Sequence, residues 1–226
     1  MSLPNTPYLV EKEMQETPGK PETVALRDGT RVTIRPIRPD DARHLQALFY
    51  RLSPESISLR FLGQPKELPY EQARQLANVD YRKRMALVAT REQGGEEHII
   101  SRSKIASRGG SHAADPRAWE PPLLQNLDPL IIAVARYAVD PAGQPDLAEA
   151  AIVVEDEYQK RGLGTLLLSR LVAYAQAHGI RAFMATVHQD NIQIMRFVRH
   201  SGLPAESTLE AGVWEIVVKL EPESEH

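Results

Sequence analysis

The sequence predicts one α+β domain in which helices flank a mixed, mostly antiparallel sheet. Three observations lead to this fold class. Residues 23–37 have the pattern of a β-hairpin. The apolar runs 130–140 and 146–155, joined by a short loop rich in proline and glycine, predict a second hairpin. The run 146–155 is followed by a helical pattern over 162–178 and a further β-rich run over 181–187, which is typical of a strand–helix–strand unit.

The N-terminal half of this domain is marked by turn and capping residues. Asp28-Gly29 is a strong hairpin signal, because both residue types tolerate the backbone conformation of a tight turn. Pro39-Asp40-Asp41 and Ser53-Pro54 are each typical of a helix start. The expected elements are two strands within 23–37, a helix from Pro39 to Leu52, a short helix from Ser53 to Leu59, a helix over 69–79 and a buried strand over 85–90.

The C-terminal half alternates strands and helices. The helix expected over 162–178 has one apolar face, and His178-Gly179 is suited to end it. That face is formed by Leu163, Leu167, Leu171 and Tyr174. Further strands are expected over 181–187 and 213–220, with an amphipathic helix over 190–200 between them.

The remaining segments lack regular patterning. Residues 1–22 are polar and carry four prolines, which indicates a flexible arm, and residues 221–226 form a solvated tail. A single domain is therefore expected over 23–220. Residues 91–128 interrupt it with Gly-Gly and Pro-Pro pairs and are expected to be an insertion, either a long loop or one with an extra strand over 98–106.

The composition argues against several classes of function. The formal net charge is −3 and no long basic run is present, which argues against nucleic acid as the main partner. The chain has no cysteine, so disulfides, cysteinyl zinc sites and a thioester on the enzyme are excluded. No cluster of His, Asp and Glu has metal-ligand spacing, so no metal is expected. No apolar run approaches the roughly 20 residues of a membrane span and no signal peptide is recognised, so a cytoplasmic protein is expected.

The stretch YQKRGLGT (158–165) joins a predicted strand to the long helix. Gly162 and Gly164 leave room for a phosphate, and the first-turn amides up to Thr165 can donate to it. A P-loop is excluded because no Gly-Lys-Ser/Thr follows, and a dinucleotide turn because Leu167 stands where a third glycine is needed. On the residues of the turn alone, a bare helix start and a phosphate cradle both stay open.

The surroundings of this turn resemble one enzyme superfamily. Q-K-R-G-L-G fits the Q/R-x-x-G-x-G/A signature of the GNAT N-acetyltransferases, placed between a strand and a long helix as in that family. Asn191 at the start of the next helix agrees with it, as does Ser201-Gly202-Leu203 in place of the family's Gly-Phe ending. Residues 26–63 resemble the opening of the acetyltransferase domain of bacterial protein lysine acetyltransferases, which is often fused to an acyl-CoA-synthetase-like module. The resemblance runs from about residue 23 to 220, with the insertion as the main departure.

The resemblance implies acetyl-CoA as the acyl donor. The sheet is then expected to splay beside the strand over 148–154, with the pantetheine arm along that strand and the amides near Val153 and Val154 orienting the acyl carbonyl. Asn191 is expected to help bind CoA, with Asp190 able to take the helix-capping role. The pyrophosphate is expected to rest on Gln159, Lys160, Arg161, Gly162, Leu163, Gly164 and Thr165.

The resemblance also implies a primary amine as the acceptor, with a protein lysine favoured, for example on an acyl-CoA synthetase. A lysine amine has a pKa of about 10.4, so a general base is needed at neutral pH. Glu149 is the candidate, because a carboxylate inside an apolar strand is costly without a purpose and partial burial would raise its pKa. The alternative is a strand-end glutamate that faces water. The tyrosine that protonates the leaving thiolate in many family members is replaced by Val198, so no general acid is assigned.

Three functional hypotheses stay open. The first is an acetyltransferase for a protein lysine, and the second is an enzyme of the same kind for a small amine or a protein N-terminus. The third is a non-catalytic CoA-binding regulatory module, motivated by the missing tyrosine and the insertion. The acceptor pocket is expected around Ser53 to Leu68 and the insertion, while His188 and the basic cluster Tyr81-Arg82-Lys83-Arg84 are expected to be structural or solvated.

Overall fold

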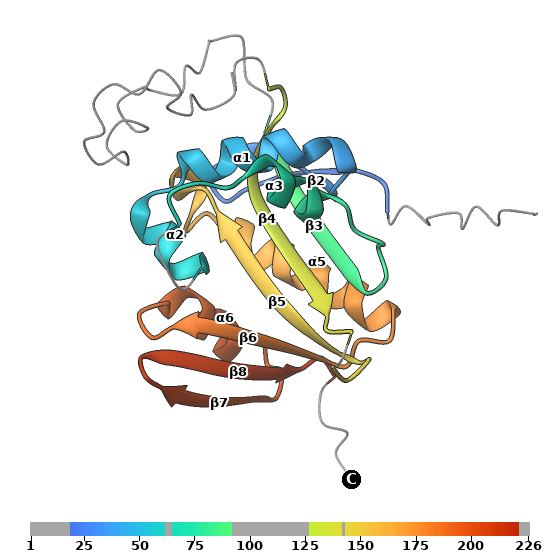
Figure 1. Ribbon diagram of the computed structural model, residues 1–226, viewed down its shortest axis with the longest axis vertical. Coiled ribbons are helices and arrows are strands. Elements are labelled where there is room, and N and C mark those ends of the chain that lie inside the picture. Colours follow the sequence, from blue (N-terminus) through green and yellow to red (C-terminus); the bar gives the residue numbers. More distant parts are fainter. Residues whose placement is uncertain (1–18, 62–64, 92–126, 142, 222–226) are drawn as a thin grey trace, which may run out of the picture.

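The computed structural model describes residues 19–61, 65–91, 127–141 and 143–221. The extra strand considered over 98–106 lies outside these residues, as do nearly all of the expected insertion and most of the N-terminal arm and C-terminal tail. The described residues form an eight-stranded sheet flanked by helices, which confirms the predicted fold class (Figure 1). Among them, no helix has the length and apolar character that a membrane span requires.

The sheet has the strand order β1-β2-β3-β4-β5-β6-β8-β7. All neighbouring strands are antiparallel except β5 and β6, which run parallel because a helix crosses between them. The strands are β1 (Glu22–Ala25), β2 (Arg31–Pro36), β3 (Arg84–Arg91), β4 (Leu130–Val139), β5 (Leu147–Val154), β6 (Ala182–His188), β7 (Ala205–Glu210) and β8 (Val213–Lys219).

Helices cover both faces of strands β2 to β5 (Figure 1). Helices α1 and α3 pack against each other on one face, with α2 beside them, while α5 packs behind β3, β4 and β5. The sheet beyond β5, formed by β6, β8 and β7, has no helix in front of it among the described residues (Figure 1). The helices are α1 (Ala42–Arg51), α2 (Pro54–Phe61), α3 (Tyr70–Ala77), α5 (Leu163–Ala177) and α6 (Ile192–His200), with short 3-10 turns η1 (Pro39–Asp41) and η2 (Asp156–Tyr158).

The core forms where these helices meet the sheet. Leu163, Leu167 and Leu171 of α5 are completely buried, which confirms the apolar face predicted for this helix. Each such side chain stabilises the fold by about 1.5–3 kcal/mol relative to an exposed one. The core therefore holds α5 firmly on the sheet and fixes where its N-terminus points.

Strand β7 was not predicted from the sequence. Its six residues, AESTLE, are all exposed, so they show no alternation of apolar and polar side chains. The strand exists because it pairs with β8 across a tight turn in which Ala211 and Gly212 both have positive φ. This is the geometry of a two-residue hairpin turn, which the single glycine in the sequence signalled only weakly.

Candidate active site

The sheet splays where β5 and β6 diverge. The two strands pair only over Leu147–Glu149 and Ala182–Met184, although β5 continues to Val154 and β6 to His188. On its other side, β5 remains paired with β4 up to Val154. One edge of β5 is therefore open beyond Glu149, at the place expected from the sequence.

Strand geometry determines which amides face this open edge. The Glu155 N–H donates to the Ile132 carbonyl of the β4 side (2.8 Å), so the N–H of Val153, two residues earlier, also points toward β4. The N–H groups of Ile152 and Val154 consequently point toward the open edge. The Val153 amide, which was expected to help orient a bound carbonyl, therefore points away from the open edge, and the amides of Ile152 and Val154 face that edge.

The turn after β5 presents a series of unpaired amides. Lys160 and Gly162 have positive φ values of 61° and 91°, a backbone geometry that gathers successive N–H groups into a concave anion site. Within the described parts of the chain, no hydrogen-bond acceptor pairs with the backbone N–H groups of residues 160–165. The turn and the first turn of α5 can therefore hold an anion such as a pyrophosphate.

The two glycines of the turn differ in what they permit. Gly162 has a left-handed φ, and a Cβ there would lie 3.3 Å from the Arg27 Nε. A Cβ on Gly164 would lie 3.7 Å from Ile152 and Val154, an ordinary contact distance. Only Gly162 is required by the backbone, whereas an alanine fits at Gly164.

Gln159 connects three elements around the open edge. Its Nε2 donates to the Ser56 Oγ (3.0 Å) and to the Val154 carbonyl (3.0 Å), and its Oε1 accepts from Gln193 of α6 (3.3 Å). Both hydrogen bonds of its amide nitrogen are thus made inside the protein. Gln159 acts as a brace of the turn here, and a role in binding pyrophosphate requires it to exchange a partner.

The positive charges of the turn have different surroundings. Arg161 forms an ion pair with Asp28 of the β1–β2 turn, and its guanidinium lies 5.3 Å from the centre of the Tyr158 ring. Lys160 is exposed and forms no ion pair within the described residues. Its charge is therefore free to reach an anion held by the turn.

Asp156 ties the N-terminus of α2 to this turn. Its carboxylate accepts hydrogen bonds from the Ser53 N–H (2.8 Å), the Ser53 Oγ (2.6 Å) and the Ser56 Oγ (2.8 Å). Partial burial works against ionisation of this carboxyl, but these hydrogen bonds outweigh it and hold the pKa of Asp156 below its ordinary value. Ser53 also accepts a hydrogen bond from the Ser56 N–H (3.1 Å), which confirms Ser53 as the predicted cap.

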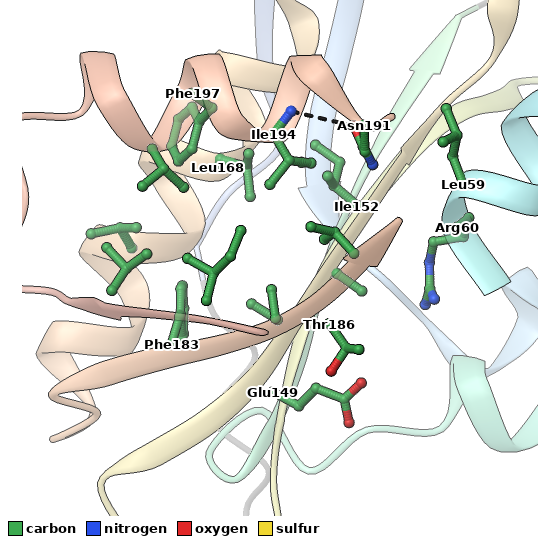
Figure 2. Close-up of a pocket in the computed structure, with 18 of the residues that line it drawn as sticks. Leu59, Arg60, Glu149, Ile152, Leu168, Phe183, Thr186, Asn191, Ile194 and Phe197 are labelled. Carbon is green, nitrogen blue, oxygen red and sulfur yellow. Dashed lines mark hydrogen bonds between the residues drawn. The ribbon is translucent and has the colours of Figure 1, made fainter. Parts of the chain in front are cut away.

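A cavity of about 270 Å³ opens at the splay. Figure 2 shows its two ends: Glu149, Thr186 and Arg60 at one, and Phe183, Leu168 and Phe197 at the other. The first end is polar and lies on the α2 side of the sheet. The second is apolar and lies between β6, α5 and α6.

Glu149 lies at the polar end, but it is exposed. The expectation that burial tunes this carboxylate is therefore wrong, because the divergence of β5 and β6 leaves its side chain open to solvent. Arg60 is its charged neighbour: burial lowers the pKa of Arg60, and the negative charge of Glu149 opposes that effect. Glu149 thus lines the candidate site as an accessible carboxylate.

Of three other positions considered from the sequence, two line the cavity and one does not. Asn191 lines it and also caps α6, since its Oδ1 accepts from the Ile194 N–H (3.3 Å), so the capping role considered for Asp190 is wrong. Val198 lines the cavity at the position where the family tyrosine was expected. His188 does not line it, and its Nδ1 accepts from the Asp190 N–H (3.2 Å).

The basic cluster before β3 lies in a turn of its own. The Asp80 Oδ1 accepts hydrogen bonds from the backbone N–H groups of Arg82, Lys83 and Arg84, and these three side chains are exposed. The solvated interpretation of this cluster agrees with the structure.

Sequence reasoning missed several lining residues. Residues around 53–68 were expected to build the acceptor pocket, and Leu59, Arg60 and Phe61 do line the cavity, but none of them was singled out. Thr186 and Ile152 were also missed. The period-two pattern of their strands carries the only signal for them, and it shows which residues share a face without showing where the sheet opens.

Comparisons with known proteins agree with this geometry. Residues 102–203 match the family model described as the acetyltransferase (GNAT) family. The chain is 29% identical over 157 residues to acetyltransferase PA5475 of Pseudomonas aeruginosa and 35% identical over 72 residues to acetyltransferase Pat of Mycolicibacterium smegmatis. These alignments cover 70% and 32% of this chain, and 66% and 21% of the relatives, so the chain spans less than two thirds of the curated relatives' length.

Solved structures give the same result. The GNAT domain of S. lividans PAT is 27% identical, with a TM-score of 0.65 over 88% of this chain and 96% of that one. The structure of yncA from Salmonella typhimurium with its cofactor acetyl-CoA shares the fold at 15% identity, with a TM-score of 0.54 over 86% of this chain and 97% of that one.

Together with the splayed sheet and the turn of unpaired amides, these matches indicate an acyltransferase with the fold of the GNAT superfamily, whose family model matches residues 102–203. Within it, the chain resembles the acetyltransferase domains of bacterial protein lysine acetyltransferases.

Proposed function

We propose that this chain transfers an acetyl group from acetyl-CoA to a primary amine by direct attack, and that the acceptor is a lysine side chain of a protein. One observation carries the proposal: the open edge of β5 leads from a turn of unpaired amides to an accessible carboxylate at the mouth of a cavity. A donor with a pyrophosphate, an extended amide-bearing arm and a thioester fits this sequence of features.

The donor would lie along β5. Residues 160–165 and the charge of Lys160 would hold the pyrophosphate, with Arg161, Leu163, Gly164 and Thr165 part of that cradle and Gln159 bracing it. The Val154 N–H would pair with the pantetheine arm, and the Ile152 N–H would donate to the thioester carbonyl. Asn191 would contribute the part of its amide not used for capping.

The transfer needs a neutral amine and a polarised carbonyl. The amine attacks the carbonyl carbon, a C–N bond forms, and the C–S bond breaks to release CoA thiolate. The amine proton passes to Glu149, directly or through water, and the thiolate takes a proton from solvent, since Val198 cannot supply one. The Ile152 amide stabilises the oxyanion of the intermediate.

The charge around Glu149 supports a cationic acceptor. Strand pairing places Thr186 beside Glu215 on the same sheet face as Glu149, and Glu206 follows on β7. These three glutamates are exposed on the sheet face opposite α6, and Glu206 also forms an ion pair with Lys219 (4.0 Å). Such a face attracts a protonated lysine and the basic segment around it.

A second acceptor class is favoured by Arg60. This half-buried side chain lines the polar end of the cavity; its guanidinium lies 4.9 Å from the centre of the Phe61 ring and makes no hydrogen bond or ion pair within the described residues. An amine that carries a carboxylate, such as a small amino acid, would satisfy it. A screen of amino acids, polyamines and proteins with acetyl-CoA distinguishes the two classes, because a small-molecule acceptor gives turnover without labelling any protein.

The test of the mechanism is Glu149→Gln. The variant keeps the shape of the side chain but cannot take the amine proton, so kcat/KM with a lysine acceptor is expected to fall about 10²–10³-fold. Thiol release from acetyl-CoA is the measurement, and raising the pH is expected to recover part of the loss because more amine is then neutral.

Glu71→Gln on α3 is the matched control, since Glu71 is exposed and forms its ion pair with Arg74 of its own helix. It is expected to leave turnover unchanged. Full activity of Glu149→Gln would remove this residue from the mechanism, and acetyl-CoA binding without turnover on any amine would contradict the proposed reaction.

A further inference from the structure

The cavity has an apolar end, at which Figure 2 shows Phe183, Leu168 and Phe197. We propose that this end accepts the hydrocarbon chain of longer straight-chain acyl-CoA thioesters, so that the donor class of this chain extends beyond acetyl-CoA. The inference rests on the proposed function for the placement of the donor. It names a binding site for the acyl chain that the chemistry of acetyl transfer does not require.

The direction of the donor follows from β5. A donor held by the turn meets Val154 first, then Ile152, and its acyl group points on toward Ala150 and the closed end of the splay, where β5 and β6 pair. The side chains of Ile152 and Val154 face α5, as their contact with the Gly164 position shows. An acyl chain that continues in this direction runs along α5, past Leu168 and toward Val172.

The walls along this path are apolar. Phe183 and Leu168 are buried, and Val172, Val218 and Leu220 also line the cavity. The carboxylate and the guanidinium of the site lie at the opposite end (Figure 2). A chain of methylene groups would therefore meet only hydrocarbon there, and each methylene removed from water is expected to tighten binding about fourfold.

Helix α6 shows that this space is not filled by the protein. The helix turns Ile194, Phe197 and Val198 toward the cavity, yet none of its residues is buried. Protein interiors are normally close-packed, so an apolar face over an open cavity lacks the contacts that a ligand would supply. The short side chain of Val198 leaves room that a larger residue would occupy.

The volume admits more than an acetyl group. The cavity measures about 270 Å³, and a methylene takes roughly the space of one water molecule, about 30 Å³. Even with the end of the pantetheine arm inside, several methylenes fit. The reaction does not depend on the length of the acyl chain. The amine nitrogen bonds to the acyl carbon and the C–S bond breaks. As with acetyl, the amine proton passes to Glu149 and the CoA thiolate takes a proton from solvent.

The first test measures binding and needs no acceptor. Acetyl-, propionyl-, butyryl- and hexanoyl-CoA are titrated into the full chain by calorimetry. The dissociation constant is expected to fall about fourfold for each of the first two added methylenes, or about 16-fold from acetyl to butyryl. Equal or weaker binding of butyryl-CoA would overturn the inference.

The second test uses a reciprocal pair of variants. Val172→Phe shortens the apolar end of the cavity and is expected to lower the butyryl-to-acetyl affinity ratio at least tenfold. Val172→Ala lengthens the apolar end and is expected to raise the affinity for hexanoyl-CoA. The ratio is the readout because a folding defect weakens both donors alike. If the butyryl-to-acetyl affinity ratio changes in neither variant, the acyl chain binds elsewhere and the assigned site is overturned.

Turnover separates this inference from the proposed function. Acetyl transfer with no gain in affinity from longer chains leaves the function standing and overturns the inference. Tighter binding of longer donors without transfer to any amine supports the acyl site and contradicts the proposed reaction.

Discussion

Asp156 shows how one residue can support the site without touching a substrate. Its carboxylate gathers three donors from Ser53 and Ser56 at the start of α2, and Ser56 in turn accepts from Gln159. This series of hydrogen bonds, which runs from Asp156 through Ser56 to Gln159, fixes the turn that would hold the pyrophosphate. Because the hydrogen bonds hold the pKa of Asp156 below its ordinary value, this support depends on pH.

The pH dependence has a definite sign. A carboxyl with a lowered pKa in the folded state contributes stability above its unfolded pKa of about 3.9 and loses that stability as the pH falls through the folded value. The stability difference between the wild type and Asp156→Asn is therefore expected to be constant above about pH 5 and to shrink below about pH 4.

We expect this difference to be about 1 kcal/mol at pH 7, because solvent screens part of the interaction of an exposed carboxylate. Urea unfolding of both proteins from pH 3.5 to 7 measures it. Ser53→Ala keeps the carboxylate but removes one of its donors and the cap of α2, so a loss with the same pH trend is expected on top of a pH-independent loss of the cap. A difference that stays the same at every pH would contradict the role of the charge.

At the scale of elements, the junction of β5 and α5 decides what the turn can bind. The helix begins directly after Gly162, whose left-handed φ turns the chain so that the first amides of α5 stay unpaired. Burial of Leu163 and Leu167 then holds the helix at that angle. The unpaired amides at this junction thus depend on one backbone conformation and one buried helix face.

The two glycines of this junction are expected to respond in opposite ways to alanine. Gly162→Ala forces a left-handed conformation on a residue with a Cβ and is expected to cost about 1–2 kcal/mol of unfolding free energy and to weaken CoA binding. Gly164→Ala fits within van der Waals distance and is expected to stabilise α5 by about 0.5 kcal/mol. Urea unfolding gives the stabilities and calorimetry the affinities; equal effects of the two variants would show that φ at Gly162 is not the determining feature.

At the scale of the whole molecule, the site exists because the sheet is closed at one end and open at the other. Helices cover β2 to β5, and the unit of β6, β8 and β7 diverges from them along β5 (Figure 1). The open edge therefore lies between two well-paired halves, with backbone groups that have no partner in the other half. A ligand that forms hydrogen bonds with these backbone groups would connect the two halves of the sheet.

Hydrogen exchange can test this view residue by residue. On addition of acetyl-CoA, the amides of Ile152 and Val154 are expected to exchange at least tenfold more slowly, because they face the open edge, while Val153, which faces β4, changes less. Ligand at 100 times its Kd is also expected to raise the unfolding free energy by about 2.7 kcal/mol. Protection of Val153 in place of its neighbours would contradict the strand register described above.

The order of elements, the buried face of α5 and the glycine turn could all be predicted from the sequence, because each depends on neighbours a few residues away. The turn at residues 159–165 was also a local signal, whereas CoA as its ligand followed from the resemblance to the acetyltransferases, and the role of Glu149 as the base stays a prediction. Strand β7 was beyond this reasoning, since an exposed strand carries no apolar alternation.

Only the tertiary structure decided how those residues act. The choice between Val153 and Ile152 depends on the pairing of β5 with β4, and the exposure of Glu149 depends on where β6 leaves β5. The cap of α6 by Asn191 and the apolar space beneath that helix depend likewise on packing between distant segments. A sequence pattern reports the face on which a side chain lies, whereas the partner of each backbone group is set by strands far away along the chain.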